Sequence, residues 1–222
     1  MVWLLILAVG SLTFSPPATA RPPLIAAAAA GDVSQIRSLL IGAAARAVVV
    51  DAKSGGTALH WAAEAGHGGA LRALAASPAA AAPNRRNDHG FAALHLAAMN
   101  SHADACDALV RDLAADASVR TSDGVTPLHL AASNGDVALV RRFLVAYRAA
   151  VDAVDARGWT ALHRAAYRGK GAAVALLRDE GGADAAAIVD DGRDAAALAR
   201  AAGHAALAAA LASASAGEAA EL

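Results

Sequence analysis

The sequence predicts an all-α fold: a solenoid of about six helix-turn-helix repeats joined by short β-turn or hairpin loops. Two observations predict it, a recurring heptapeptide and its constant spacing. The segment 126–132 reads TPLHLAA, and close copies of it begin at Thr57, Ala92 and Thr160. The leucines of the four copies are separated by steps of 35, 34 and 34 residues and lie at Leu59, Leu94, Leu128 and Leu162. Self-similarity at a fixed period of this size is the signature of a stacked repeat array.

The composition excludes several classes of protein. Of the 222 residues 57% are hydrophobic, and the formal net charge is -1. A balance this close to neutral gives no global field for nucleic acid or anionic lipid, so no nucleic-acid partner is expected. Alanine accounts for most of the apolar excess; it is a strong helix former that buries little area. The single cysteine, Cys106, excludes an intrachain disulfide, and its register with Ile36 and Val140 predicts a buried thiol.

The first twenty residues differ from the rest of the chain. Residues 1–14 are apolar, two prolines follow at 16 and 17, and Ala18-Thr19-Ala20 resembles a signal-peptidase site. The apolar run is shorter than the ~20 residues that span a membrane as a helix. Residues 1–20 are therefore expected to be a signal peptide or hydrophobic leader, although no Lys or Arg precedes the apolar core. The alternatives are a weak membrane anchor or a wrongly assigned start codon, so the expected location is the secretory pathway or the extracellular space, and otherwise the cytoplasm.

The repeats follow in order from the phase of the leucines. They are predicted to cover residues 21–212, and a tail with no periodic apolar face, predicted to be flexible, covers 213–222. The predicted repeats are 21–50, 51–83, 84–117, 118–151, 152–185 and 186–212. The first and last are degenerate: Leu24 and Ala196 keep the phase, but the Thr and His of the motif are gone. Degenerate ends suit terminal repeats, which cover only one neighbour.

Each residue type in the repeat has a physical role. A glycine precedes the motif and permits a tight turn. The motif threonine is expected to cap the first helix, and Pro127 suits its first turn. The alanine pair lets neighbouring helices approach closely, and a second glycine, such as Gly135, ends the helix. The second helix carries the Val/Leu face that packs on the next repeat.

This pattern resembles the ankyrin-repeat family, and the fourth repeat, with Thr126-Pro127-Leu128-His129, is the closest copy. The resemblance implies an ankyrin-repeat solenoid that binds another protein on a concave face made by the loop tips and the first helices. It also implies that the motif histidines hydrogen-bond between adjacent loops. These histidines recur with the repeat, so they form a ladder, which cannot converge on one metal ion. The histidines of the ladder are His60, His95, His129 and His163.

No motif for catalysis or cofactor binding is present. The sequence has no nucleophile elbow, phosphate-binding loop, dinucleotide fingerprint or zinc-type cysteine pair. We therefore expect no enzyme activity, no cofactor and no small-molecule substrate. A metal-binding or enzymatic protein is the remote alternative.

The expected partner-binding residues are the positions of the concave face that the motif leaves free. They are Trp61, Glu64, Phe91, Met99, Asn100, Val125, Ser133, Asn134, Trp159, Arg164, Tyr167 and Arg168. Exposed aromatic residues with arginine are enriched at interface hot spots, and the fifth repeat holds the densest cluster. The alternative for each residue is packing against the neighbouring loop.

Charge in the fifth repeat suggests the chemistry of the partner. Arg157 and Lys170 add to the arginines already named there, so a protein with an acidic segment is the expected partner of a monomeric chain. A small regulatory inhibitor or assembly chaperone that occludes its partner is the alternative function.

Overall fold

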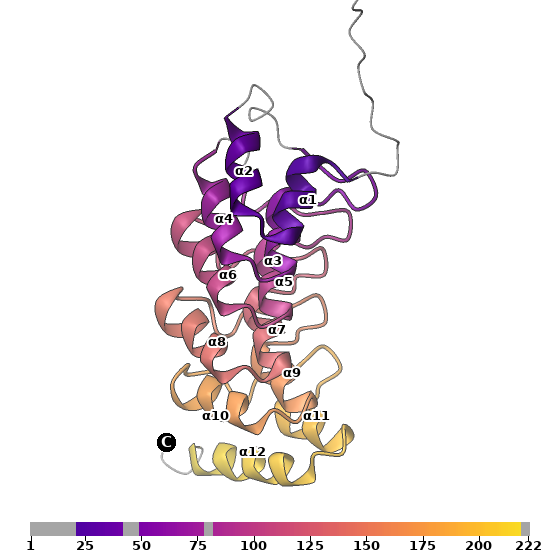
Figure 1. Ribbon diagram of the computed structural model, residues 1–222. Helices are drawn as coiled ribbons and strands as arrows, with labels where there is room; N and C mark the ends of the chain where they lie inside the picture. The colour runs from indigo at the N-terminus through magenta and orange to yellow at the C-terminus, as the bar shows by residue number, and fades with distance from the viewer. Residues whose placement is uncertain (1–20, 42–48, 78–81, 219–222) are drawn as a thin grey trace, which may run out of the picture.

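The structure, a computed structural model, describes residues 21–41, 49–77 and 82–218, and it places helix pairs in one continuous stack (Figure 1). The inner helices are α1 (Pro23–Ala30), α3 (Ala58–Glu64), α5 (Ala93–Met99), α7 (Pro127–Asn134), α9 (Ala161–Tyr167) and α11 (Ala195–Ala201). The outer helices are α2 (Val33–Leu40), α4 (Gly68–Ala75), α6 (Ala103–Asp107) with η3 (Ala108–Asp112), α8 (Val137–Arg141) with η4 (Arg142–Ala146), α10 (Gly171–Asp179) and α12 (Ala205–Glu218). The predicted helical solenoid is confirmed. The leader, residues 1–20, lies outside the described residues.

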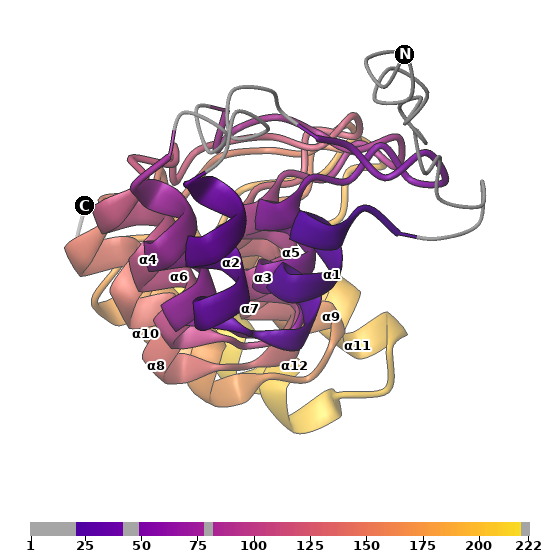
Figure 2. The same ribbon diagram turned by 45° about the horizontal axis from the view of Figure 1, so that its top comes forward.

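Turn loops lead into the inner helices and project together from one side of the stack (Figure 2). In the loop before α7, the Thr121 N–H donates to the Val125 carbonyl at 2.9 Å, and Gly124 turns the chain with φ 75°. Successive loops are joined as well, since the Ala156 N–H donates to the Asp123 carbonyl at 2.8 Å. The loops are therefore β-turn loops, as predicted. Isolated antiparallel bridges join Val50 to Thr57, Arg86 to Ala92 and Ile188 to Asp194.

The corner, which is the turn between the inner and the outer helix of a repeat, requires a residue with positive φ, in the left-handed backbone conformation. Gly135 has φ 78° after α7, and its N–H donates to the carbonyls of Ala131 and Ala132, both at 3.1 Å. A glycine adopts this conformation without steric cost. In the third repeat Ser101 occupies the same corner with φ 59°, so that repeat carries backbone strain.

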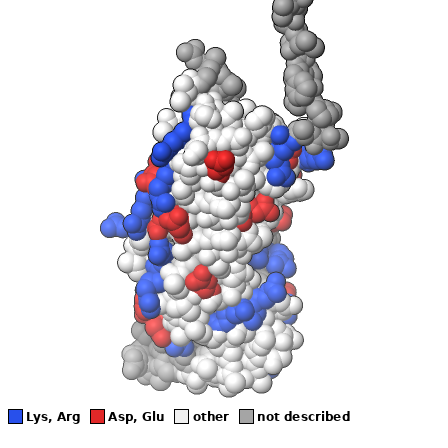
Figure 3. Space-filling view, in the orientation of Figure 1, with Lys and Arg blue, Asp and Glu red and all other residues white. Residues whose placement is uncertain are grey.

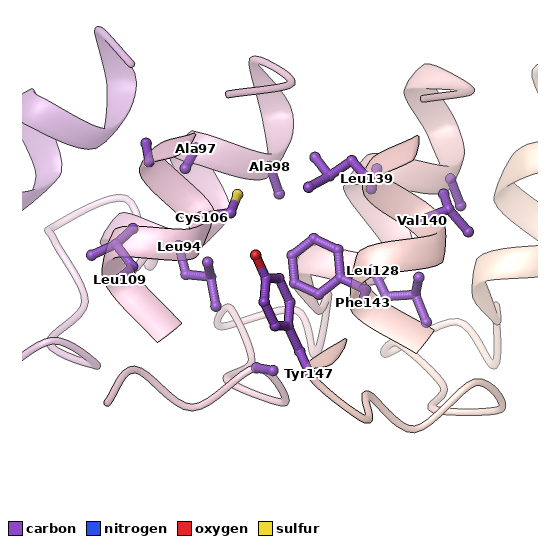
Figure 4. Packing of buried hydrophobic residues seen from close by; sticks show 14 of the residues in the cluster. Leu94, Ala97, Ala98, Cys106, Leu109, Leu128, Leu139, Val140, Phe143 and Tyr147 are labelled. Atoms are coloured by element: carbon purple, nitrogen blue, oxygen red, sulfur yellow. The ribbon is translucent and has the colours of Figure 1, made fainter. Parts of the chain in front are cut away.

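The core runs the length of the stack, and alanine lets the inner helices pack closely. The alanine pairs are fully buried: Ala62, Ala63, Ala97, Ala98, Ala131, Ala132, Ala165 and Ala166. Between the inner and outer layers lie larger side chains, among them Leu94, Leu128 and Phe143 (Figure 4). Cys106 is fully buried among them, and burial raises the pKa of its thiol to about 12. The predicted buried thiol is confirmed.

Ion pairs connect successive outer helices along the stripe at the left edge of Figure 3. Arg72 pairs with Asp104 and with Asp112, the latter at 3.2 Å, and Arg141 pairs with Glu180 at 2.6 Å. These side chains are roughly half exposed, so solvent screens each pair and its contribution to stability is small.

The last helix, α12, continues to Glu218, beyond the predicted end of the repeat domain at residue 212. Within residues 21–41, 49–77 and 82–218, no helix is long and apolar enough to cross a membrane.

Candidate functional site

The histidine of each motif connects its own loop to the next. His129 Nδ1 lies 3.2 Å from the Thr126 backbone N and 2.7 Å from Thr126 Oγ1, and Nε2 lies 2.8 Å from the Trp159 carbonyl oxygen. A backbone N–H can only donate, so Nδ1 carries no proton and Nε2–H donates to Trp159. The same Nε2 contact joins His60 to Phe91, His95 to Val125 and His163 to Ala187. The predicted hydrogen bonding between adjacent loops is confirmed.

The threonine and histidine of the motif together form a capping box at the start of the inner helix. In repeats two, four and five the threonine faces the backbone N–H of the histidine, while histidine Nδ1 accepts from the threonine N–H. The predicted threonine cap is a hydrogen bond in repeat five, where the His163 N–H donates to Thr160 Oγ1 at 3.4 Å, whereas Thr57 and Thr126 make no such bond. In all three repeats histidine stands in the place usually held by Glu or Gln. Ala92 in repeat three keeps only the backbone half, a 3.1 Å bond to His95 Nδ1.

Burial keeps the ladder histidines neutral. Desolvation lowers the pKa of His95 and of His129 to about 4, against the hydrogen bonds to backbone carbonyls that raise it. Burial likewise lowers the pKa of His60 and of His163. Both ring nitrogens of these histidines are in use: Nδ1 accepts from the backbone of its own motif and Nε2 donates to the next loop.

A hollow of about 440 Å³ opens on the inner face, the surface that the inner helices and loops form together. It lies between the ends of α7, α9 and α11, where basic side chains gather at the lower right of Figure 3. Five residues predicted as partner-binding line it: Ser133, Trp159, Arg164, Tyr167 and Arg168. The structure thus brings together the cluster predicted to be densest.

Aromatic side chains give the hollow a rigid wall. Trp159 is only 9% exposed, and its ring meets Tyr167 edge-on with centroids 5.4 Å apart. The Arg157 guanidinium lies 4.5 Å above the Trp159 ring. The Trp159 side chain is therefore packed between its neighbours and largely buried. The prediction that it is an exposed aromatic anchor was wrong. Val125 is also only 9% exposed, and its loop is joined to the next one by the Ala156 N–H, which donates to the Asp123 carbonyl.

Asp155 holds Arg164 at the edge of the hollow. Its Oδ2 accepts from Arg164 at 2.6 Å, and its Oδ1 accepts from the backbone N–H groups of Arg157 and Trp159 at 2.8 and 3.0 Å. Burial alone raises the pKa of Asp155, but these hydrogen bonds outweigh it, so the pKa lies below its usual value. The Asp155–Arg164 pair is therefore charged and fixed at neutral pH.

A comparison with known families decides the family of this fold. The family model for ankyrin repeats (3 copies) matches residues 24–121, 94–189 and 128–219. The chain belongs to the ankyrin-repeat family. No curated protein matches it. Ankyrin repeats are generally protein–protein interaction modules and are typically non-catalytic.

Two of the residues predicted to bind a partner instead connect neighbouring inner helices of the ankyrin stack. Asn100 Nδ2 donates to the Glu64 carbonyl at 3.2 Å, and Asn134 Nδ2 donates to the Met99 carbonyl. Each asparagine therefore ties the end of its inner helix to the preceding one, although both side chains are exposed.

The remaining predicted positions lie away from the hollow. Met99 is 38% exposed, Glu64 is exposed and Phe91 is half-buried. Trp61 is half-buried beneath the Arg21 guanidinium, 3.7 Å from its ring centroid. These residues belong to other stretches of the ankyrin inner face.

Arg193 lines the hollow and was missed by the sequence prediction. A signal for it existed, because Arg193 stands 34 residues after Trp159, at the same position of the next ankyrin repeat. The sixth repeat lacks the Thr and His of the motif, so the equivalence of Arg193 and Trp159 was not used in the prediction. Lys170, predicted to add charge here, is absent from the lining and instead lies at the corner beside Gly135.

Proposed function

We propose that this ankyrin-repeat protein is a non-catalytic recognition module that binds the acidic segment of a partner protein at the hollow between α7, α9 and α11. The observation that carries the proposal is the lining of that hollow. Four arginines, Arg157, Arg164, Arg168 and Arg193, share it with the exposed ring of Tyr167. Arginine and aromatic residues are the types enriched at binding hot spots.

The frame behind the hollow is rigid, which favours binding. The carbonyl of Trp159 is held by His129, and Arg164 is held by Asp155. A preformed surface loses little conformational entropy on binding, so more of the contact energy appears as affinity.

Binding can be tested with three versions of the full chain: wild type, the double variant Tyr167→Ala/Arg168→Glu, and the control Arg148→Glu. Tyr167 and Arg168 are exposed on the inner face, and Arg148 is an exposed arginine next to the end of η4. Each chain is immobilised, and retained proteins are quantified by mass spectrometry, with circular dichroism to check folding. We expect proteins with acidic segments to be retained by wild type and by the control, and lost with the double variant. Identical retention by all three would refute the proposal.

A further inference from the structure

The charges in the hollow do not cancel. Of its four arginines, Arg164 pairs with Asp155, and Arg193 pairs with Asp191. Arg157 and Arg168 have no acidic side chain within ion-pair distance in the part of the chain that the structure describes. Two positive charges are therefore left uncompensated in one hollow of about 440 Å³.

Three of the four guanidinium groups are held in place by neighbouring side chains. Arg157 stacks over Trp159, Arg164 is held by Asp155 at 2.6 Å, and Arg193 is held through its Nε by Asp191 at 3.0 Å. One guanidinium nitrogen of Arg164, Nη2, donates to Asp155. The Nε of Arg164 is buried and has no hydrogen-bond partner among the described residues. Of the two arginines without an acidic partner, Arg157 is therefore fixed before binding, so it loses little entropy when a ligand arrives.

Two neighbouring carboxylates are a poor match for such a site. Successive side chains of an extended peptide point to opposite faces, and those two positions apart are separated by nearly 7 Å. One tetrahedral phosphoryl group instead brings about two negative charges and three acceptor oxygens to a single point. Arginine suits that geometry, because its planar fork binds phosphate through two parallel hydrogen bonds.

We infer that the hollow is a subsite for a phosphorylated side chain in the acidic segment of the partner. The phosphoryl group contacts Arg168 and Arg157, the two guanidinium groups without an acidic partner, and Tyr167 packs against the atoms that carry it. This inference rests on the proposed function, since it specifies the anion that the recognition module selects.

The test uses fluorescent peptide libraries with one fixed central residue among degenerate acidic flanks, measured by fluorescence anisotropy with the full chain. The central residue is Ser, Glu, phosphoserine, phosphotyrosine or sulfotyrosine. We expect either phosphorylated library to bind at least tenfold more tightly than the Glu library. Phosphotyrosine should also bind more tightly than sulfotyrosine, which has a similar shape and only one negative charge.

Two variants locate the effect. Arg168→Gln should abolish the phosphate preference, whereas Arg148→Gln, outside the hollow, should keep it. Equal binding of the Glu and phosphorylated libraries would overturn the inference while leaving acidic-segment binding intact. A phosphate preference that survives Arg168→Gln would also overturn it. Inorganic phosphate is the last arm: if it binds the chain as tightly as the phosphopeptides do, the hollow is a small-anion site and the inference fails.

Discussion

Acidification should destabilise this protein through its buried histidine ladder. His95 and His129 have pKa values of about 4 in the folded chain, below the value of 6.5 expected when unfolded. The unfolded chain therefore binds more protons between these values, so stability is complete above pH 6.5 and is lost as the pH falls toward 4. At pH 5 each of the two contributes about 2 kcal/mol less than at pH 7.5, or about 4 kcal/mol together. His60 and His163 act in the same direction.

The loss can be measured by urea unfolding at pH 7.5 and pH 5, followed by circular dichroism. The informative variant is His95→Gln/His129→Gln, because Gln is a usual partner in a capping box and does not titrate. It should be less stable than wild type at pH 7.5 but should lose about 4 kcal/mol less on acidification. The control His89→Gln removes an exposed histidine and should behave as wild type.

Two results would refute this reasoning. One is a wild-type protein equally stable at pH 7.5 and pH 5. The other is a double glutamine variant that loses as much stability as wild type does. The carboxylates do not explain a loss in this window: the pKa of Asp107 and of Asp155 is lowered from 3.8, so their contribution is lost only in stronger acid.

Four further outcomes follow from the fold. Ser101→Gly should stabilise the chain by about 0.5–1 kcal/mol in thermal unfolding, because Ser101 has φ 59°, which glycine adopts without strain. Gly135→Ala should destabilise the chain in the same assay, because Gly135 has φ 78° and a new Cβ there would meet the Lys170 side chain. Phe143→Ala should cost about 3–5 kcal/mol in urea unfolding, because the ring is fully buried. The Cys106 thiol should react with a soluble disulfide reagent only after denaturant is added, because it is fully buried with a pKa of about 12; rapid reaction of the folded chain would contradict this burial.

Most of the fold was predictable because every repeat meets the same packing problem. A residue with one role in repeat four has the same role 34 residues later, so the phase of Leu128 places the turn, the inner helix and the corner of its neighbours. Departures from the motif were harder to predict. The outer helices of repeats three and four end in the π-helices η3 and η4, for which we identified no sequence signal. Each is followed within two residues by a non-glycine residue with positive φ, Ala114 and Arg148.

The sequence predicted where the side chains that line the hollow lie, but it did not predict which of them are exposed. The phase correctly grouped Arg164, Tyr167 and Arg168, because they lie at the end of one inner helix. It did not show that Trp159 is covered, since this depends on Arg157 stacking above it and on Tyr167 beside it. Burial at a loop position is decided by neighbours in the adjacent repeat, which a single-repeat pattern does not contain.

The position before the motif threonine serves both the frame and the surface, and the two uses involve different atoms. The carbonyls of Phe91, Val125 and Trp159 each accept a hydrogen bond from the histidine of the preceding repeat. A carbonyl is present whatever the side chain, so this hydrogen bond places no demand on the side chain, although the side chains of Val125 and Trp159 are themselves buried. At Arg193 the same position supplies a charge to the hollow, and there the histidine of the preceding repeat, His163, contacts the Ala187 carbonyl instead. The residue at this position can thus differ between repeats while each ladder histidine still contacts a carbonyl of the next loop.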